Sequence, residues 1–348
     1  MHKEEESMNA LVRRAIATAK LIGGALLVTS ALATAASAQT TLRLSTMAEV
    51  GSDQLEYVET FAQKVEEATE GRIQIKIYPA NQLGDWTEVH EQLMQGAVDM
   101  ASQSLSTKFD KAMALAWFPY TITDYESARE AYSRGGHVYD VIAEALEKQD
   151  IRLLGVYAAG MGGAGFTKPV PNPGDPNAER NLKLRIWPGG ETHRVLMERF
   201  GFSTAPLPWA ELYTGLQTGI VDGLVGGTPE MQYQSLKDVT KVWVQYNDHF
   251  EPSWLVASKQ RFEALPEEDQ KIIADIGHEM TLASMEAMEE RDNYYLKALE
   301  EAGVEVILLS KEELEAYAKI AREEVWPKIA GEIGEENMQK ILDRMAAN

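Results

Sequence analysis

One arginine stands inside an apolar segment, and it is the residue of this sequence best suited to bind an anion. Residues 182–187 read LKLRIW, so Arg185 is flanked by Leu184 and Ile186. Its side chain either reaches solvent from an edge strand or turns its guanidinium toward a cleft. In a sheltered cleft this planar group suits a carboxylate, a sulfonate or a phosphate, because two parallel hydrogen bonds fix the orientation of the anion. The segment alone leaves both alternatives open.

Three tryptophans stand next to strand ends or helix starts, where ligand contacts are common. Trp187 is two residues from Arg185, so on a strand both side chains point to the same face and form one wall. Trp209 begins a predicted helix over residues 209–218, and Trp86 begins another that runs to residue 95. A tryptophan is typical of a hydrophobic core, but open α/β sheets bind ligands at the ends of their strands. We therefore expect these indoles to line the same site as Arg185.

Strand and helix patterns alternate along the chain. The predicted elements are, in order, strand 41–46, helix 55–69, strand 73–78, helix 86–95 and strand 98–101, then strand 182–187, helices 191–200 and 209–218, and strand 219–225. This order predicts an α/β fold with a largely parallel sheet and helices on both of its faces.

A glycine-rich run, GMGGAG at residues 160–165, directly follows a predicted strand over 151–158. It fits the G-x-G-x-x-G pattern of dinucleotide sites, but that pattern needs a helix after it to hold the pyrophosphate. Prolines follow instead, at Pro169, Pro171, Pro173 and Pro176, and they cannot continue a helix at this density. We therefore predict no nucleotide cofactor here. We interpret the run as a crossover between two lobes, or as a place where a ligand approaches the backbone closely.

Residues 266–302 form one long helical pattern. Pro266 suits the first helical position, and the acidic residues after it suit the positive end of the helix dipole. At about 1.5 Å per residue the helix would exceed roughly 50 Å, which is longer than one lobe. We expect it to span two lobes, unless Gly277, the single glycine inside it, splits it.

Motifs for metal, nucleophilic or phosphate chemistry are missing from the sequence. There is no cysteine, which excludes disulfides and thiolate sites. The six histidines stand in no zinc-ligand spacing, so we interpret them as surface or core residues. Neither a G-x-S-x-G elbow nor a G-x-x-x-x-G-K-[ST] loop occurs. We predict no metal and no cofactor, and nothing in the sequence favours an enzyme.

Composition and the N-terminal segment indicate an exported protein. The chain has 348 residues and a net charge of −21, which argues against nucleic acid as a partner. Residues 1–38 contain basic residues, a short apolar core and a final Ala-Ser-Ala, the layout of a secretory signal peptide cleaved after Ala38. The alternative is an N-terminal membrane anchor, but the apolar core is short for a membrane span. We predict a periplasmic protein.

Four separated segments resemble the substrate-binding proteins of TRAP (tripartite ATP-independent periplasmic) transporters, the DctP-like family. They are GRIQIKIYPANQLGD at 71–85, LMQGAVDMA at 93–101, LKLRIWPGG at 182–190 and WAELYTGLQTGIVDG at 209–223. The resemblance runs from about Thr41 to the C-terminal region. It implies a two-lobed periplasmic binding protein fold, with interlobe crossing strands and a long spanning helix. The implied lobes are residues 41–158 with 251–290, and 159–250 with 291–348, with the ligand in the cleft between them.

The resemblance also implies roles for individual residues. Arg185 matches the arginine that holds the carboxylate of the ligand, and Trp209 and Trp86 match ligand-contacting positions. Ser102 and Gln103 follow the strand 98–101, where the family places polar ligand contacts. The implied partners are a small organic anion, above all a carboxylate, and the membrane subunits of the transporter. We expect a monomer.

Two departures from the family pattern affect the expected ligand. Ala164 stands near the place of a second arginine of many family members, and Gly226 where an asparagine is common. Both changes remove a polar group and are expected to add room. A sulfonate or a zwitterion with a delocalised cation therefore stays open as ligand. Two further alternatives are a periplasmic enzyme using Glu211 or Asp222, and a ligand sensor for a signalling partner.

Overall fold

The computed structural model describes residues 39–347, so the predicted signal peptide and its cleavage site lie outside the described residues. The described residues from Thr41 onward form one compact unit. Among residues 39–347, no helix has the length and the apolar character needed to cross a membrane.

The first of two β-sheets has five strands in the order β2-β1-β3-β10-β4. Its strands are β1 (Thr40–Thr46), β2 (Ile73–Tyr78), β3 (Met100–Gln103), β4 (Ile151–Met161) and β10 (Phe250–Ser258). The helices that come between these strands in sequence are α2 (Asp53–Ala68), α3 (Trp86–Met94), the 3-10 helix η1 (Lys111–Trp117), α4 (Tyr125–Tyr132) and α5 (His137–Glu147).

The second sheet has six strands in the order β11-β9-β5-β8-β6-β7. Its strands are β5 (Ala164–Phe166), β6 (Lys183–Ile186), β7 (Ser203–Pro206), β8 (Gly223–Val225), β9 (Val242–Gln245) and β11 (Glu305–Leu308). The helices around it are α6 (Glu191–Arg199), α7 (Trp209–Thr218), α8 (Pro229–Met231) and the short η2 (Gln232–Leu236). The two sheets with their helices form the two lobes of the fold, and the residue boundaries that we predict for the lobes remain a prediction.

The expectation of largely parallel strands is confirmed, but each sheet also contains one strand that runs against both of its neighbours. β10 is antiparallel to both β3 and β4, and β5 is antiparallel to both β8 and β9. The chain passes directly from β4 to β5 and from β9 to β10, so each of these connections joins one sheet to the other. Since no crossover helix precedes β5 or β10, these strands need not run parallel to their neighbours.

The glycine-rich run is one of these two connections, as predicted. Gly162 lies between β4 and β5 and donates its backbone N–H to the carbonyl of His249, 2.8 Å away in the other connection. A Cβ at Gly162 would lie only 2.1 Å from the His249 ring. Glycine is therefore required here because the two crossing segments approach each other closely.

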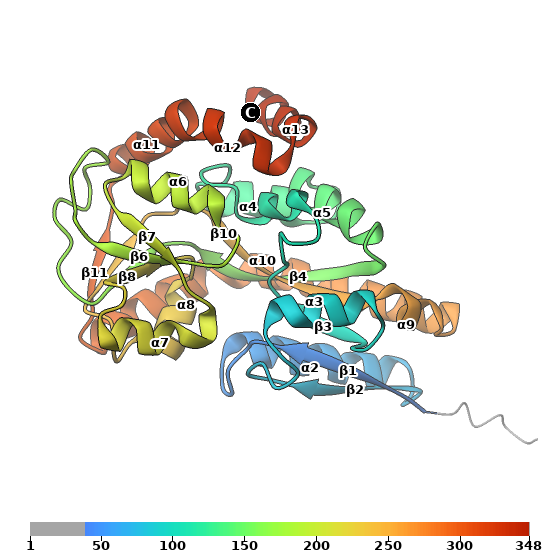
Figure 1. Ribbon diagram of the computed structural model, residues 1–348. Coiled ribbons are helices and arrows are strands. Elements are labelled where there is room, and N and C mark those ends of the chain that lie inside the picture. Colours follow the sequence, from blue (N-terminus) through green and yellow to red (C-terminus); the bar gives the residue numbers. More distant parts are fainter. Residues whose placement is uncertain (1–38, 348) are drawn as a thin grey trace, which may run out of the picture. The chain divides into compact units, whose positions relative to one another are not determined.

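The long helix α10 (Glu267–Glu301) is unbroken over 35 residues, as predicted. It runs along β4, the edge strand of the first sheet, and also contacts α8 and β11 near the second sheet (Figure 1). Thr281 and Ser284 accept hydrogen bonds of 2.8 Å from the backbone N–H groups of Val156 and Ala158. The helix thus supplies acceptors that an edge strand otherwise lacks.

Gly277 does not split α10, because it is the point of closest contact with β4. A Cβ at this position would lie 2.6 Å from the carbonyl oxygen of Leu154.

We expect Gly277→Ala to lower the free energy of unfolding by about 1–3 kcal/mol. Alanine favours a helix, but the backbone must move to admit the methyl group, and this movement outweighs the gain in helix propensity. Denaturant unfolding measures this change. Gly331→Ala is the matched control, since its Cβ would meet no atom within 4 Å, and it should be neutral or stabilising. Equal stability of Gly277→Ala and the wild type would contradict the close contact.

The C-terminal helices complete the fold, after the short α9 (Lys259–Glu263) and the long α10. They are α11 (Lys311–Ile320), η3 (Ala321–Val325), α12 (Trp326–Ile333) and α13 (Glu335–Ala347). α12 packs against both η1 and α6, and α13 packs against α5 (Figure 1). Trp326 anchors this layer, since its indole N–H donates to the carbonyl of Pro119 at 2.8 Å.

Candidate ligand-binding site

A narrow cavity of about 40 Å³ lies beside Arg185, with room for a few water molecules. Residues from elements of both sheets and their helices line it. They are Met47, Trp86, Ser104, Trp117, Arg185, Trp187, Trp209, Gly226, Met231 and Glu251. The structure therefore brings together five of the site residues named from the sequence, namely Trp86, Arg185, Trp187, Trp209 and Gly226.

Arg185 is held in the interior of the second sheet. Its strand β6 lies between β7 and β8, and its side chain is only 3 % exposed, so the edge-strand alternative is wrong. Its Nε–H donates to the carbonyl oxygen of Leu207 at 2.8 Å, and its guanidinium carbon lies 5.6 Å from the ring centroid of Trp209. Among the described residues, none accepts a hydrogen bond from its two Nη atoms. Both remain available to a ligand.

The charge of Arg185 is buried without a direct counter-ion. Burial lowers the pKa of its guanidinium to about 10, against the opposing influence of Glu251 and Asp85, so Arg185 stays charged at neutral pH. Glu251 lines the same cavity, yet no carboxylate among residues 39–347 lies within 4.0 Å of the guanidinium. A buried, uncompensated cation is costly, and an anionic ligand would relieve that cost.

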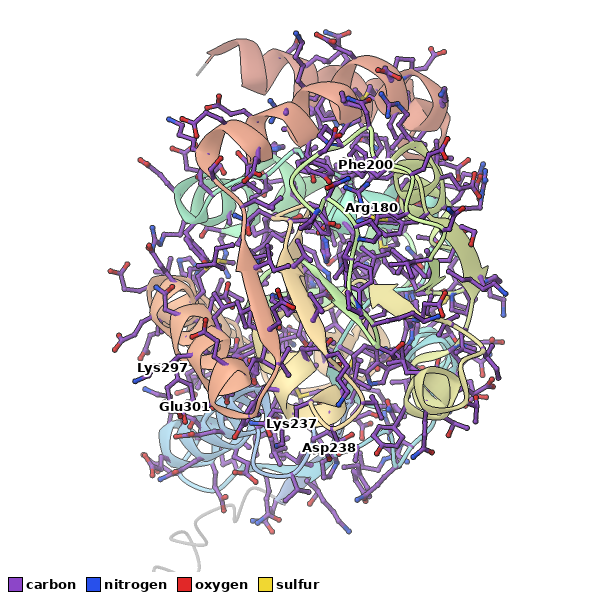
Figure 2. The ribbon with its side chains drawn as sticks, turned by 90° about the vertical axis from the view of Figure 1, so that its left-hand side faces the viewer. Arg180, Phe200, Lys237, Asp238, Lys297 and Glu301 are labelled. Atoms are coloured by element: carbon purple, nitrogen blue, oxygen red, sulfur yellow. The ribbon has the colours of Figure 1, made fainter. Side chains whose placement is uncertain are left out.

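Arg180, the other deeply buried arginine near this strand, shows how a structural arginine differs. Its Nη2 donates to the carbonyls of Asn172 and Asp175 at 2.9 and 2.6 Å and to the hydroxyl of Tyr317 at 2.7 Å. Its Nη1 donates to the carbonyl of Phe200, next to which it lies in Figure 2. Arg180 thus uses both Nη atoms to hold the chain together, whereas Arg185 uses only its Nε.

The positions of Gly226 and Ala164 correct the expectation that these two residues add room. A Cβ at Gly226 would lie 2.7 Å from Cζ3 of Trp187, and its φ of +85° is one that glycine adopts readily. The Trp187 ring therefore fills the space that a larger residue at 226 would take. Ala164 is fully buried in β5 between β8 and β9 and is not part of the cavity lining. Neither position enlarges the cavity.

Ser102 and Gln103 lie behind the cavity wall rather than on it. Ser102 Oγ lies 3.2 Å from Ser253 Oγ, and Gln103 donates its side-chain amide to the carbonyl of Trp86 at 2.8 Å. Ser104, one residue further along, does line the cavity. Gln103 thus holds the start of α3 and with it Trp86, while direct contact of Ser102 and Gln103 with a ligand remains a prediction.

The sequence analysis did not single out Glu251 and Trp117, which line the cavity and are hydrogen-bonded to each other. The Trp117 indole N–H donates to Glu251 Oε1 at 3.0 Å. β10 runs from Phe250 to Ser258, so Glu251 lies inside this strand. The available signal was a carboxylate between Phe250 and Pro252, which is weaker than the signal of an arginine between Leu184 and Ile186.

Glu251 is the outer member of a buried network of charges. His249 Nε2 lies 3.3 Å from Glu251 Oε2, and His249 Nδ1 lies 2.9 Å from Asp248 Oδ2. Burial alone would lower the pKa of His249, but Asp248 and Glu251 together raise it to about 10, so the ring is a cation at neutral pH. Burial would raise the pKa of Asp248, but the attraction of His249 and a hydrogen bond from His193 at 3.1 Å keep it below its usual range. Burial lowers the pKa of His193 in spite of its contact with Asp248.

The same cluster has the composition of a metal site, since donor atoms of His193, Asp248 and His249 lie within 4.8 Å of one another. However, both ring nitrogens of His249 face carboxylate oxygens, and a protonated imidazole donates with both and keeps no lone pair for a metal. The geometry therefore fits an ion network better than a metal centre. The two histidines fit the prediction that they are hydrogen-bonded core residues.

Met47, Trp209 and Met231 line both this cavity and a second hollow of about 30 Å³. That hollow is lined by Glu230, which accepts a hydrogen bond of 2.6 Å from the hydroxyl of Tyr157. Burial raises the pKa of Glu230. Arg291 of α10 lies nearby, with its Nε 3.6 Å from Glu230 Oε2. This arginine is paired with Glu230, and among the described lining residues of the Arg185 cavity there is no second arginine.

A larger hollow of about 580 Å³ lies elsewhere, beside α11 and η3. It is lined partly by Lys311, Lys319, Glu315 and Glu323. These residues are exposed, and each lysine lies within 4.0 Å of one of the two glutamates. A cation that is already paired and hydrated interacts weakly with a further anion. Arg185 is therefore the stronger candidate for an anion site, in spite of the smaller volume of its cavity.

Two α/β lobes that are joined by crossing strands, with a cavity lined by residues of both, are typical of periplasmic binding proteins. The chain matches the model of the bacterial extracellular solute-binding protein family 7 over residues 44–332, and it belongs to this family. It is 25 % identical to the ectoine-binding periplasmic protein TeaA of Halomonas elongata, covering 84 % of this chain and 85 % of that one. It is 26 % identical to the sialic acid-binding periplasmic protein SiaP of Vibrio cholerae, covering 75 % and 82 %. A TRAP periplasmic solute-binding protein of Desulfovibrio salexigens, solved with bound orotic acid, has the same fold with a TM-score of 0.77 at 21 % identity, over 87 % and 96 % of the two chains.

Proposed function

We propose that this protein captures a small organic solute carrying a carboxylate and delivers it to the membrane subunits of a TRAP transporter. The proposal depends above all on Arg185, a buried cation that lines a cavity walled by tryptophans. Among residues 39–347, no group accepts a hydrogen bond from its two Nη atoms. Two parallel hydrogen bonds from these atoms would hold a carboxylate in one orientation. Trp187, Trp209 and Trp86 would then form the walls around the body of the ligand, beside Gly226.

The named relatives support a carboxylate. One is named for ectoine and another for sialic acid, and a structural relative binds orotic acid. All three solutes contain a carboxylate, although the bodies attached to it differ greatly. The three solutes therefore share the carboxylate, the group that we propose Arg185 binds.

Binding requires the two lobes to open, because a cavity of about 40 Å³ is too small for an organic acid. The two direct connections between the sheets, β4–β5 and β9–β10, are the natural hinge. A ligand that contacts residues of both lobes would favour the closed state, and closure would present it to the transporter. The periplasm, with a signal peptide cleaved after Ala38, is the corresponding location.

The alternative of an enzyme has less support from the geometry. Glu211 is exposed on α7, and Asp222 is engaged by Lys168, whose Nζ lies 2.6 Å from its carboxylate. Neither residue lines the cavity. A sensor would use the same site as a transport receptor, and neighbouring genes for transporter membrane subunits would favour transport.

A thermal-shift screen tests the proposal. The protein is heated with carboxylates, sulfonates, aromatic acids and zwitterions, including ectoine and sialic acid. A carboxylate at about a hundred times its Kd should stabilise the protein by about 2.7 kcal/mol, which raises its melting temperature by several degrees. Recovery of the unchanged solute after binding separates a receptor from an enzyme. A shift given only by solutes without a carboxylate would contradict the proposal.

A further inference from the structure

The cavity contains a fixed negative charge as well as the positive charge of Arg185. Glu251 is largely buried on β10 and lines the cavity together with Arg185. The two residues do not form an ion pair within 4.0 Å, although they are close enough for Glu251 to influence the pKa of Arg185. Each is held by other partners, Arg185 by the Leu207 carbonyl and Glu251 by Trp117 and His249. An anion site and a cation site therefore face the same small space.

Glu251 places a carboxylate beside the space that an anion bound to Arg185 would occupy. Behind it, His249 contacts the carboxylates of both Asp248 and Glu251, at 2.9 and 3.3 Å. A ligand with only a carboxylate would add a negative charge beside Glu251 in a poorly hydrated space, where like charges repel strongly. A ligand that carries a positive charge next to its carboxylate adds no net charge.

The rest of the cavity wall offers few partners to a polyhydroxylated solute. Apart from the indole N–H groups, Ser104 supplies the one uncharged polar side chain among the described lining residues. Buried hydroxyl groups without hydrogen-bond partners would cost about 1–3 kcal/mol each. Indole rings, in contrast, attract cations through their faces, and four tryptophans line the cavity.

We infer that the ligand is a compact zwitterion, with its carboxylate on the Nη atoms of Arg185 and its cationic nitrogen against Glu251. The inference rests on the proposed function and makes it more specific. Glu251 is the residue that selects a zwitterion over a simple anion, and His249 and Trp117 hold its carboxylate in place.

Matched pairs of ligands test this selection by isothermal titration calorimetry. Each pair consists of a zwitterion and a separate carbon analogue, which has the same shape but lacks the positive charge. The pairs are glycine betaine with 3,3-dimethylbutanoate, proline with cyclopentanecarboxylate, and pipecolate with cyclohexanecarboxylate. The wild-type protein is expected to bind at least one zwitterion tenfold or more tightly than its analogue. In Glu251→Gln, which keeps the side-chain shape, that preference should fall to less than threefold.

Asp269→Asn is the control, since it removes a buried carboxylate that pairs with Arg72 at 2.8 Å, away from the cavity. It should keep the preference of the wild type. If Glu251→Gln fails to fold, the comparison of the ligand pairs in the wild-type protein still tests whether the site prefers a zwitterion. Equal binding of zwitterions and analogues by the wild type, or an unchanged preference in Glu251→Gln, would overturn the inference and leave the proposed function in place. Absence of binding by every carboxylate in these pairs and in the thermal-shift screen would overturn the proposed function itself.

Discussion

Arg185→Lys is expected to weaken ligand binding at least tenfold, and Arg185→Met about a hundredfold. Lysine keeps the positive charge but loses the planar fork that binds both oxygens of a carboxylate. Methionine removes the charge as well, and truncating one partner of a buried charge pair costs about 2–5 kcal/mol, of which about 3 corresponds to a hundredfold change in Kd. Calorimetric titration with the best solute from the thermal-shift screen measures both losses.

The melting temperature of the ligand-free variants separates lost binding from lost folding. In the part of the chain that the structure describes, no counter-ion lies within 4.0 Å of the buried Arg185, so Arg185→Met should melt within a few degrees of the wild type or above it. Arg199→Lys is the control, since Arg199 pairs with Glu324 at 2.7 Å at a partly exposed position away from the cavity. It should bind like the wild type. Unchanged affinity in both Arg185 variants would show that Arg185 does not hold the ligand.

Asp248→Asn is expected to cause the largest loss of stability, about 3–5 kcal/mol. Asp248 is fully buried and is the acceptor for both His249 and His193, at 2.9 and 3.1 Å. Without its charge, the cation of His249 is left with Glu251 alone, and an unpaired buried charge is strongly destabilising. Denaturant unfolding at pH 7 measures the loss, and Asp275→Asn, which breaks an exposed pair with Lys271, should change the midpoint little.

The same network gives a pH dependence of stability with a defined sign. Folding raises the pKa of His249 from 6.5 to about 10, so the folded state binds its proton more tightly than the unfolded state. This contribution is complete below pH 6.5 and is lost as the pH rises through about 10. The wild type should therefore lose stability between pH 7 and pH 10.5, and Asp248→Asn should lose less over that range. Parallel curves for the two proteins would contradict the assigned network.

Much of the fold could be predicted because its signals are local. The apolar run around Arg185 became β6 (Lys183–Ile186), and the following helices became α6 and α7 within about a residue of their predicted ends. The long helix was visible as one continuous periodic pattern, and the glycine run with its prolines excluded a nucleotide-binding helix. Each of these signals depends on residues close together in sequence.

The missed features depend on contacts between distant segments. The antiparallel direction of β10 and β5 follows from the way the chain crosses between sheets, which no periodicity encodes. Gly226 was expected to add room, but the ring of Trp187, 39 positions earlier, fills that space. Glu251 and Trp117 meet across 134 positions of sequence. The position of Glu251 in the cavity depends on contacts between distant segments, so it could not be predicted from a local pattern. The position of Arg185 could be, because the residues around it form a local pattern.

The most direct measurement is a crystal structure of the protein with the solute that gives the largest thermal shift. We expect the carboxylate of the solute within about 3 Å of both Nη atoms of Arg185, between Trp187 and Trp209. A solute whose carboxylate lies away from Arg185, or that occupies the hollow beside Lys311 instead, would contradict the proposed binding site.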